Sequence, residues 1–285
     1  MHNILFLLNY KSLQLLCKMQ LNRNTFLFLQ KLTDCMKRHI PNLVTGLNLL
    51  SGCIAILFAV QGQYIGTAIF VFLGIFFDFF DGLLARKLNV QSDLGLQLDS
   101  LADVVTSGIV PGLVMYSLIN DAIGGSSAFV VDNGWNTKVD WIGVEISPLA
   151  LIGFLITIAS AYRLAKFNID LDQQSYFKGL PVPANTLLIL SLPLIQYYQY
   201  SVTIANLFGR LWFLIAVTLL SCYFLNANIK LFALKFKTWD FKPNAVRYLF
   251  LLASIVLLIC FKFIAIPVII LSYILVSLLT QKSIS

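Results

Sequence analysis

The chain has 285 residues, of which 59% are apolar and only 12% are charged, and its formal net charge is +7. Soluble domains contain roughly 45–50% apolar residues, so this composition excludes an ordinary soluble protein and predicts several membrane-spanning segments. The positive charge is expected to hold cytoplasmic loops beside anionic lipid, and the sequence has no aromatic-basic motif that would support a nucleic-acid partner.

The N-terminal stretch is apolar but is interrupted by Lys11, Lys18 and Arg23, and no small-residue cleavage site of a signal peptide follows it. Two hypotheses stay open for residues 1–35. They form an amphipathic helix at the membrane surface, or they are an extension that is not native and the protein starts at Met36. The second hypothesis has support from "MKRHIPNLVTGLNLL", a short basic lead into an apolar segment.

Eight apolar segments follow along the chain, at residues 43–60, 64–82, 94–118, 147–168, 182–200, 205–224, 246–262 and 264–280. Most of them reach the roughly 20 residues needed to cross about 30 Å of hydrocarbon. Each must be helical, because lipid cannot form hydrogen bonds with an exposed backbone. The predicted fold class is therefore all-α, a polytopic membrane helical bundle with about eight transmembrane helices. The last two segments form a tight hairpin, or one of them is re-entrant.

The distribution of lysine and arginine predicts that both ends of this bundle are cytoplasmic. Only three basic residues then lie on the outer side of the membrane, namely Lys138, Arg210 and Lys262. Thirteen lie at cytoplasmic sites: Lys37, Arg38, Arg86, Lys87, Arg163, Lys166, Lys178, Lys230, Lys235, Lys237, Lys242, Arg247 and Lys282. This asymmetry agrees with the positive-inside rule.

Carboxylates are concentrated in and between the second and third segments. Five of the thirteen acidic residues lie there: Asp78, Asp81, Asp93, Asp99 and Asp103. An aspartate in mid-span costs roughly 2.5–3.5 kcal/mol on insertion scales, so a group of them requires a compensating partner. Helical spacing of three and four places Asp78, Asp81, Gly82 and Ala85 in one stripe, and Gly95, Asp99 and Asp103 in another.

The predicted topology brings the two stripes together at the cytoplasmic end of a helical hairpin. Converging carboxylates repel unless a cation lies between them, and oxygen ligands without nearby Cys or His suit Mg²⁺ or Mn²⁺. The small residues Gly82, Ala85 and Gly95 leave room between the helices, and Arg86 places a fixed positive charge suited to phosphate beside the site. The alternative is that the aspartates reach the headgroup region and pair with Arg86 and Lys87.

The stretch "DFFDGLLARKLNVQSDLGLQLDSLAD" reads DxxDGxxAR, then eight residues, then GxxxDxxxD. This pattern resembles the signature of the CDP-alcohol phosphotransferase family, with every fixed position present. Four further stretches are similar to the membrane-integral phosphatidylserine synthases of bacteria: "IPNLVTGLNLLSG", "DSLADVVTSGIVPG", "YRLAKFNI" and "FKGLPVPAN". Two positions depart from that pattern, Lys166 where arginine is common and Asn185 where a small residue is common.

The resemblance implies a two-metal site that uses Mg²⁺ or Mn²⁺. Asp78, Asp81 and Asp99 are the expected main metal ligands, and Asp103 is expected at the edge of the metal site, as a further ligand and as the general base. The residues expected to line the pocket for the CDP group are Gly82, Ala85, Arg86, Gly95, Thr45 and Asn48.

Two basic residues on the same cytoplasmic side have two possible roles. Arg163 or Lys178 holds a phosphate or the carboxylate of serine, or both residues only mark the topology. Arg163 is the stronger candidate, because it lies within the end of a span rather than in a loop.

The resemblance also implies an activity, the transfer of a phosphatidyl group from CDP-diacylglycerol to L-serine with release of CMP, in phospholipid biosynthesis. It implies a homodimer in the bacterial inner membrane with the active site facing the cytoplasm. The catalytic region is expected at residues 36–200, followed by C-terminal transmembrane helices at 201–285.

Two alternatives to the serine enzyme remain. Glycerol 3-phosphate or inositol phosphate could be the acceptor, although these substrates would need additional basic residues. The aspartates could instead form the pathway of a divalent-cation transporter, but such a pathway should cross the middle of the membrane, whereas these residues gather at one end.

Overall fold

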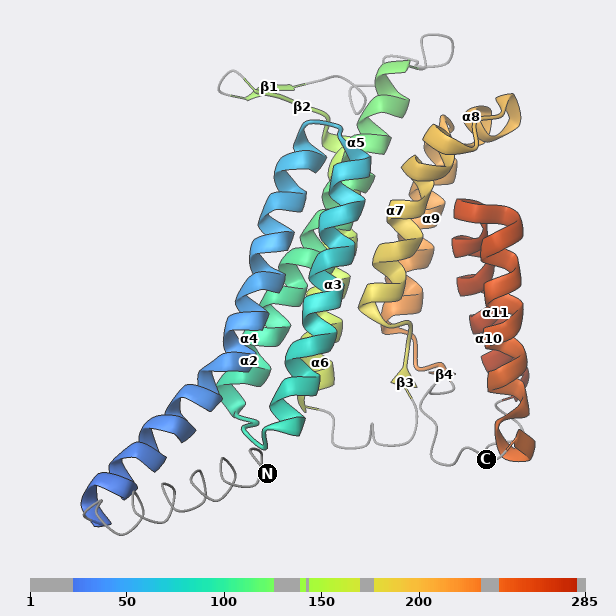
Figure 1. The fold of residues 1–285 in the computed structure, drawn as a ribbon. Helices are drawn as coiled ribbons and strands as arrows, with labels where there is room; N and C mark the ends of the chain where they lie inside the picture. The colour runs from blue at the N-terminus through green and yellow to red at the C-terminus, as the bar shows by residue number, and fades with distance from the viewer. Residues whose placement is uncertain (1–22, 126–138, 142–143, 170–176, 232–240, 281–285) are drawn as a thin grey trace, which may run out of the picture.

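The computed structural model describes residues 23–125, 139–141, 144–169, 177–231 and 241–280 (Figure 1). Residues 1–22 lie outside the described part of the chain, and so does most of the surface helix proposed there. The first described helix, α2 (Arg23–Val60), already contains Met36, and a native start at Met36 stays a prediction.

The first two long helices form an antiparallel hairpin that carries half of the site. Helix α2 is followed by a tight turn in which Gly62 has φ of 69°, a backbone conformation open mainly to glycine. Helix α3 (Tyr64–Lys87) then packs along α2 (Figure 1). It ends in a second turn, where Asn89 has φ of 54°. Asparagine tolerates this left-handed conformation better than most residues, so the chain can reverse at this point.

The next span consists of three segments in succession. Helix α4 (Asp93–Asp103) begins where the Ser92 hydroxyl accepts a hydrogen bond from Gly95 N, which satisfies one of the free amides of a helix start. A π-helix (Val104–Ile109) follows directly, and α5 (Val110–Gly125) continues the same path.

The remaining elements are mostly helical, with short strands at the ends of the bundle. Strand β1 (Val139–Trp141) pairs antiparallel with β2 (Val144–Ile146), and β3 (Phe177–Lys178) pairs antiparallel with β4 (Lys230–Leu231). The two pairs lie at opposite ends of the bundle (Figure 1). The helical segments are a 3₁₀-helix (Pro148–Phe154), α6 (Leu155–Ile169), α7 (Val182–Tyr198), α8 (Val202–Phe208), α9 (Leu211–Asn226), α10 (Phe241–Phe261), a 3₁₀ turn (Lys262–Ile264) and α11 (Ala265–Thr280).

The predicted helical membrane architecture is confirmed, although the strands were not expected. Among the described residues, five helices are long and apolar enough to cross a membrane, and α8 with α9, bent by 67°, makes a sixth if counted as one span. The five are His39–Val60, Tyr64–Lys87, Asp93–Gly124, Pro148–Ile169 and Arg247–Leu279. The chain is therefore an integral membrane protein, but this count does not confirm eight spans.

The buried core holds the site-bearing hairpin against the centre of the bundle. The main apolar cluster joins residues of α2, α3, α5, α7 and α9 and includes Ala55, Val71, Val114, Ile189 and Leu214. A second cluster of Leu180, Ile270 and Ile274 docks α11 beside α7. The α10–α11 hairpin thus covers the edge of the bundle opposite α2 and α3 (Figure 1).

Candidate active site

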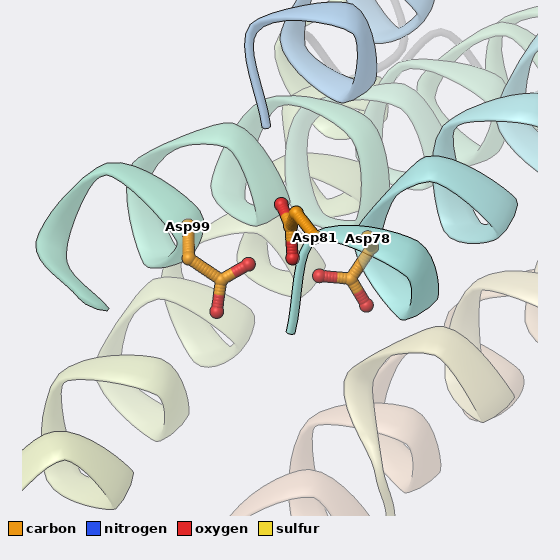
Figure 2. A group of neighbouring side chains, drawn as sticks. All are labelled: Asp78, Asp81 and Asp99. Atoms are coloured by element: carbon orange, nitrogen blue, oxygen red, sulfur yellow. The ribbon is translucent and has the colours of Figure 1, made fainter. Parts of the chain in front are cut away.

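Three aspartates from two helices converge at one place. Asp78 and Asp81 are three residues apart on α3 and therefore share a face, and Asp99 comes from α4. One carboxylate oxygen from each residue lies within 4.8 Å of the others. Figure 2 shows the three carboxylates turned toward a common space. The structure thus brings together three of the four aspartates that the sequence assigned to a metal site.

The chemistry of this cluster fits a divalent cation. Three carboxylates this close repel one another unless a proton or a cation lies between them. Asp81 is only 4% exposed, and Asp99 Oδ1 is buried without a hydrogen-bond partner in the described part of the chain. An unsatisfied buried carboxylate oxygen is costly, and a hard cation such as Mg²⁺ or Mn²⁺ would satisfy it. The alternative was that Arg86 pairs with the aspartates. Arg86 Nε donates a hydrogen bond to Gly82 O of its own helix, at 3.0 Å.

Asp103 lies one turn beyond Asp99, at the last position of α4. It is not in the three-carboxylate group. Its Oδ1 accepts a hydrogen bond of 3.2 Å from Asn48 Nδ2, which reaches it from α2. Asp103 still lies close enough to Asp78 and Asp99 to interact with their charges, and its service as a fourth metal ligand stays a prediction.

The two predicted residues on α2 have different positions. Thr45 lines the pocket beside the aspartates, and its hydroxyl donates to Asp81 Oδ2 at 2.6 Å. Asn48, one turn further along, is fully buried and is not among the residues that line this pocket. The structure therefore places Asn48 behind the site, in contact with Asp103, rather than at the surface expected to face the CDP group.

A pocket of about 470 Å³ opens beside the aspartates, between α2, α3 and α4. Its volume lies within the roughly 300–1,000 Å³ of typical small-molecule sites. Gly82, Ala85, Arg86, Gly95 and Thr45, all predicted from the sequence, line it. The sequence did not single out Pro41, Asn42, Val90, Gln91, Ser92 or Leu96, which also line it, nor assign Asp93 to it.

The glycines of the motif have two physical roles in this pocket. A Cβ atom at Gly82 would meet only Arg86 Nη2, at 3.9 Å. Because Gly82 has no side chain, the pocket wall stays open at this position. A Cβ atom at Gly95 would lie 3.2 Å from both Asn42 Oδ1 and Ser92 Oγ. Gly95 therefore lets α4 approach two polar side chains, and the packing that brings Asn42 to the pocket is visible only in the structure.

Arg163 lies on α6 and is buried, and its Nε has no hydrogen-bond partner among the described residues. Its charge interacts with the side chain of Tyr273 on α11. The end of α6 is tied to α4 by a hydrogen bond of 2.9 Å from Asn168 Nδ2 to Ser100 Oγ, next to Asp99. Lys178 lies in β3, and its side chain is outside the described residues.

Other buried polar groups without partners were not predicted. Among the described residues they include Ser107 Oγ, Ser160 Oγ and both amide atoms of Asn185. They belong to the π-helix, α6 and α7, the elements around Arg163. Buried polar atoms are normally paired with protein or with water, so water or a polar ligand would be needed to pair these groups.

Comparison with known proteins gives one family and several relatives. The sequence model of a family described as CDP-alcohol phosphatidyltransferase matches residues 38–225. A CDP-diacylglycerol–serine O-phosphatidyltransferase of Bacillus subtilis is 35% identical over 149 residues, which are 51% of this chain and 70% of that protein. One of Helicobacter pylori, with the same name, is 28% identical over 74% of this chain and 79% of its own length. An archaetidylserine synthase of Methanothermobacter thermautotrophicus is 30% identical, over 56% of this chain and 60% of that protein.

Proposed function

The chain belongs to the CDP-alcohol phosphatidyltransferase family, and we propose that it is a phosphatidylserine synthase. It transfers the phosphatidyl group of CDP-diacylglycerol to the hydroxyl of L-serine and releases CMP, a step of phospholipid biosynthesis. The observation that carries this proposal is the group of Asp78, Asp81 and Asp99, of which Asp81 and Asp99 line the pocket of about 470 Å³. Serine as the acceptor has support from the names of the relatives from bacteria and an archaeon.

The clustered aspartates would hold the divalent cation, Mg²⁺ or Mn²⁺. When bound, this ion neutralises the charge of the pyrophosphate and of the departing phosphate. Thr45 holds the Asp81 carboxylate by its hydrogen bond of 2.6 Å, so less reorganisation is needed when the ligand set forms. Gly82, Ala85 and Gly95 give the CDP group access to the helices, and Arg86 offers a fixed positive charge to a phosphate.

Asp103 acts as the general base. Its carboxylate takes the proton of the serine hydroxyl while the serine oxygen attacks the phosphorus that bears the diacylglycerol. A new phosphorus–oxygen bond to serine forms, and the bond between that phosphorus and the oxygen bridging to CMP breaks. CMP leaves with the electron pair of this bond, and the product is phosphatidylserine.

The acceptor assignment is tested by an assay of the purified protein in lipid nanodiscs with CDP-diacylglycerol and Mn²⁺ or Mg²⁺. We expect CMP release and labelled phospholipid with L-serine, and neither with glycerol 3-phosphate or inositol phosphate. Turnover with one of the phosphorylated alcohols alone would replace serine as the acceptor. No CMP release with any alcohol would refute the enzyme.

Arg163 is the proposed partner of the serine carboxylate, because its guanidinium is buried with Nε unpaired. Replacing one member of a buried charge pair costs roughly 2–5 kcal/mol, so Arg163→Gln is expected to raise the KM for serine by about 30-fold or more. The KM for CDP-diacylglycerol should stay unchanged. Initial rates with each substrate varied in turn measure both constants.

Lys178→Gln is the comparison for this variant. If it raises the KM for serine while Arg163→Gln does not, Lys178 is the carboxylate partner. If both variants have the wild-type KM for serine, the two basic residues mark only the topology.

The alternative of a cation transporter receives little support. Family membership favours transfer chemistry, and the aspartates lie together beside a pocket between α2, α3 and α4. A transport pathway would need ionisable groups across the membrane.

For the architecture, we propose eight spans, with α7 as a short span and α10 and α11 as two antiparallel ones. The catalytic region is residues 36–200, followed by C-terminal helices at 201–285, and the family match extends into this second part. We place the protein in the bacterial inner membrane as a homodimer, with its site facing the cytoplasm. Basic residues lie at the helix ends next to the site, and the positive-inside rule places such ends in the cytoplasm.

A further inference from the structure

A chain of two hydrogen bonds connects Thr106 with Asp103 through Asn48. The Thr106 hydroxyl lies 2.9 Å from Asn48 Oδ1 and 3.2 Å from Asn48 O, so both of its acceptors among the described residues belong to Asn48. Asn48 Nδ2 in turn donates to Asp103 Oδ1 at 3.2 Å. An asparagine amide accepts only through its oxygen and donates only through its nitrogen. A donor at Oδ1 therefore selects the orientation in which Nδ2 faces Asp103.

Two glycines form the socket that holds this pair of side chains. A Cβ atom at Gly52 of α2 would lie 2.4 Å from Thr106 Oγ1. A Cβ atom at Gly74 of α3 would lie 2.6 Å from Thr106 Cγ2 and 2.9 Å from Asn48 Oδ1. Both contacts are too short for any residue with a side chain. Thr106 and Asn48 are both fully buried, so neither can exchange its partner for bulk water.

The backbone around Thr106 is also unusual. Thr106 lies within the π-helix of Val104–Ile109, which starts directly after Asp103. Such segments are rare and frequently occur at functional sites. The wider turn lies where the third span meets α2 and α3, at the point where Thr106 reaches Asn48.

We propose that Thr106 is a positioning residue for the transfer reaction. It orients the Asn48 amide so that the amide nitrogen occupies Asp103 Oδ1, which leaves Oδ2 of Asp103 to receive the proton of the acceptor hydroxyl. The inference rests on the proposed function, because it gives Asp103 the role of base. It adds that the orientation of this base is set from the first helix of the hairpin and the π-helix together.

The test is Thr106→Val, which keeps the shape of the side chain and removes its donor. Without this donor nothing selects the orientation of the Asn48 amide, and Asp103 is no longer held for proton transfer, so kcat is expected to fall by about 5- to 150-fold, which corresponds to about 1–3 kcal/mol of transition-state stabilisation. The KM values for both substrates and the affinity for Mn²⁺, measured by electron paramagnetic resonance, should stay at the wild-type values. Thr106→Ser keeps the hydroxyl and should restore most of kcat.

Thr67→Val is the matched control, because Thr67 is a fully buried threonine of α3 whose hydroxyl donates to Gln63 O of its own helix. It should keep the wild-type kcat. A double-mutant cycle with Asn48→Ala then separates positioning from packing. If Thr106 acts through Asn48, Thr106→Val adds no further loss of kcat once Asn48 is replaced.

Three results would overturn the inference: a wild-type kcat in Thr106→Val, no recovery in Thr106→Ser, or additive losses in the cycle. If Thr106→Val does not fold, Thr106→Ala replaces it in the same double-mutant cycle, because alanine adds no atom to the socket. Failure of the proposed function is a separate result, because the wild-type protein would then release no CMP. If another alcohol is the acceptor, the same variants are assayed with that alcohol.

Discussion

Asp103→Asn is expected to lower kcat by about 10²–10⁴-fold, the usual contribution of a positioned general base. The introduced amide has the shape of the carboxylate and can still accept the hydrogen bond from Asn48, but it cannot take the proton of the serine hydroxyl. Binding of CDP-diacylglycerol should be substantially retained. CMP release measures turnover, and titration of the nanodisc-embedded variant with labelled CDP-diacylglycerol measures binding.

Asp121→Asn is the matched control for this variant. Asp121 is exposed and lies near the end of α5, at the opposite end of the same continuous span. It should show the wild-type kcat. Turnover of Asp103→Asn at the wild-type rate would exclude Asp103 as the base, and lost binding of CDP-diacylglycerol would assign it to the substrate or metal site instead.

Asp99→Asn is expected to weaken the binding of Mn²⁺ by more than about 100-fold. Loss of a contact that only supports a metal ligand costs roughly 10–100-fold in affinity, and Asp99 contributes its own oxygen to the three-carboxylate group. Electron paramagnetic resonance of Mn²⁺ titrated into the purified protein gives the affinity without reference to turnover. Asp78→Asn should behave in the same way.

Asp121→Asn should again bind Mn²⁺ like the wild-type protein. If Asp99→Asn and Asp78→Asn both keep the wild-type affinity, the clustered carboxylates are not the metal site. Activity that survives complete chelation of divalent cations in the wild-type protein would contradict the same assignment independently.

The positions of the helices followed well from the sequence. The segment predicted at 182–200 is α7 (Val182–Tyr198), and the one predicted at 264–280 is α11 (Ala265–Thr280). The agreement has a simple cause, because in lipid the length of an apolar run and the need for internal hydrogen bonds leave only a helix. The number of spans was harder to predict, since the bend between α8 and α9 depends on packing.

The main carboxylate cluster was also predicted from spacing. Asp78 and Asp81 share a helix face by the period of the α-helix, and the short turn after α3 returns α4 beside it, so Asp99 could be placed without coordinates. Asn48 was assigned to the CDP pocket because it occupies the same helix as Thr45. One helical turn separates the two residues, and the structure alone distinguishes the wall of the pocket from the layer behind it.

By itself, the sequence determined that this protein is a helical membrane protein and that an aspartate cluster forms at one end of a hairpin. Both properties follow from local rules, the hydropathy of a segment and the period of a helix. Only the tertiary structure decided that Thr106 reaches Asn48, that Asn48 reaches Asp103, and that Gly52 and Gly74 make room for them. These contacts join residues 55 and 58 positions apart, and no periodicity within a single helix encodes how two helices are rotated against a third.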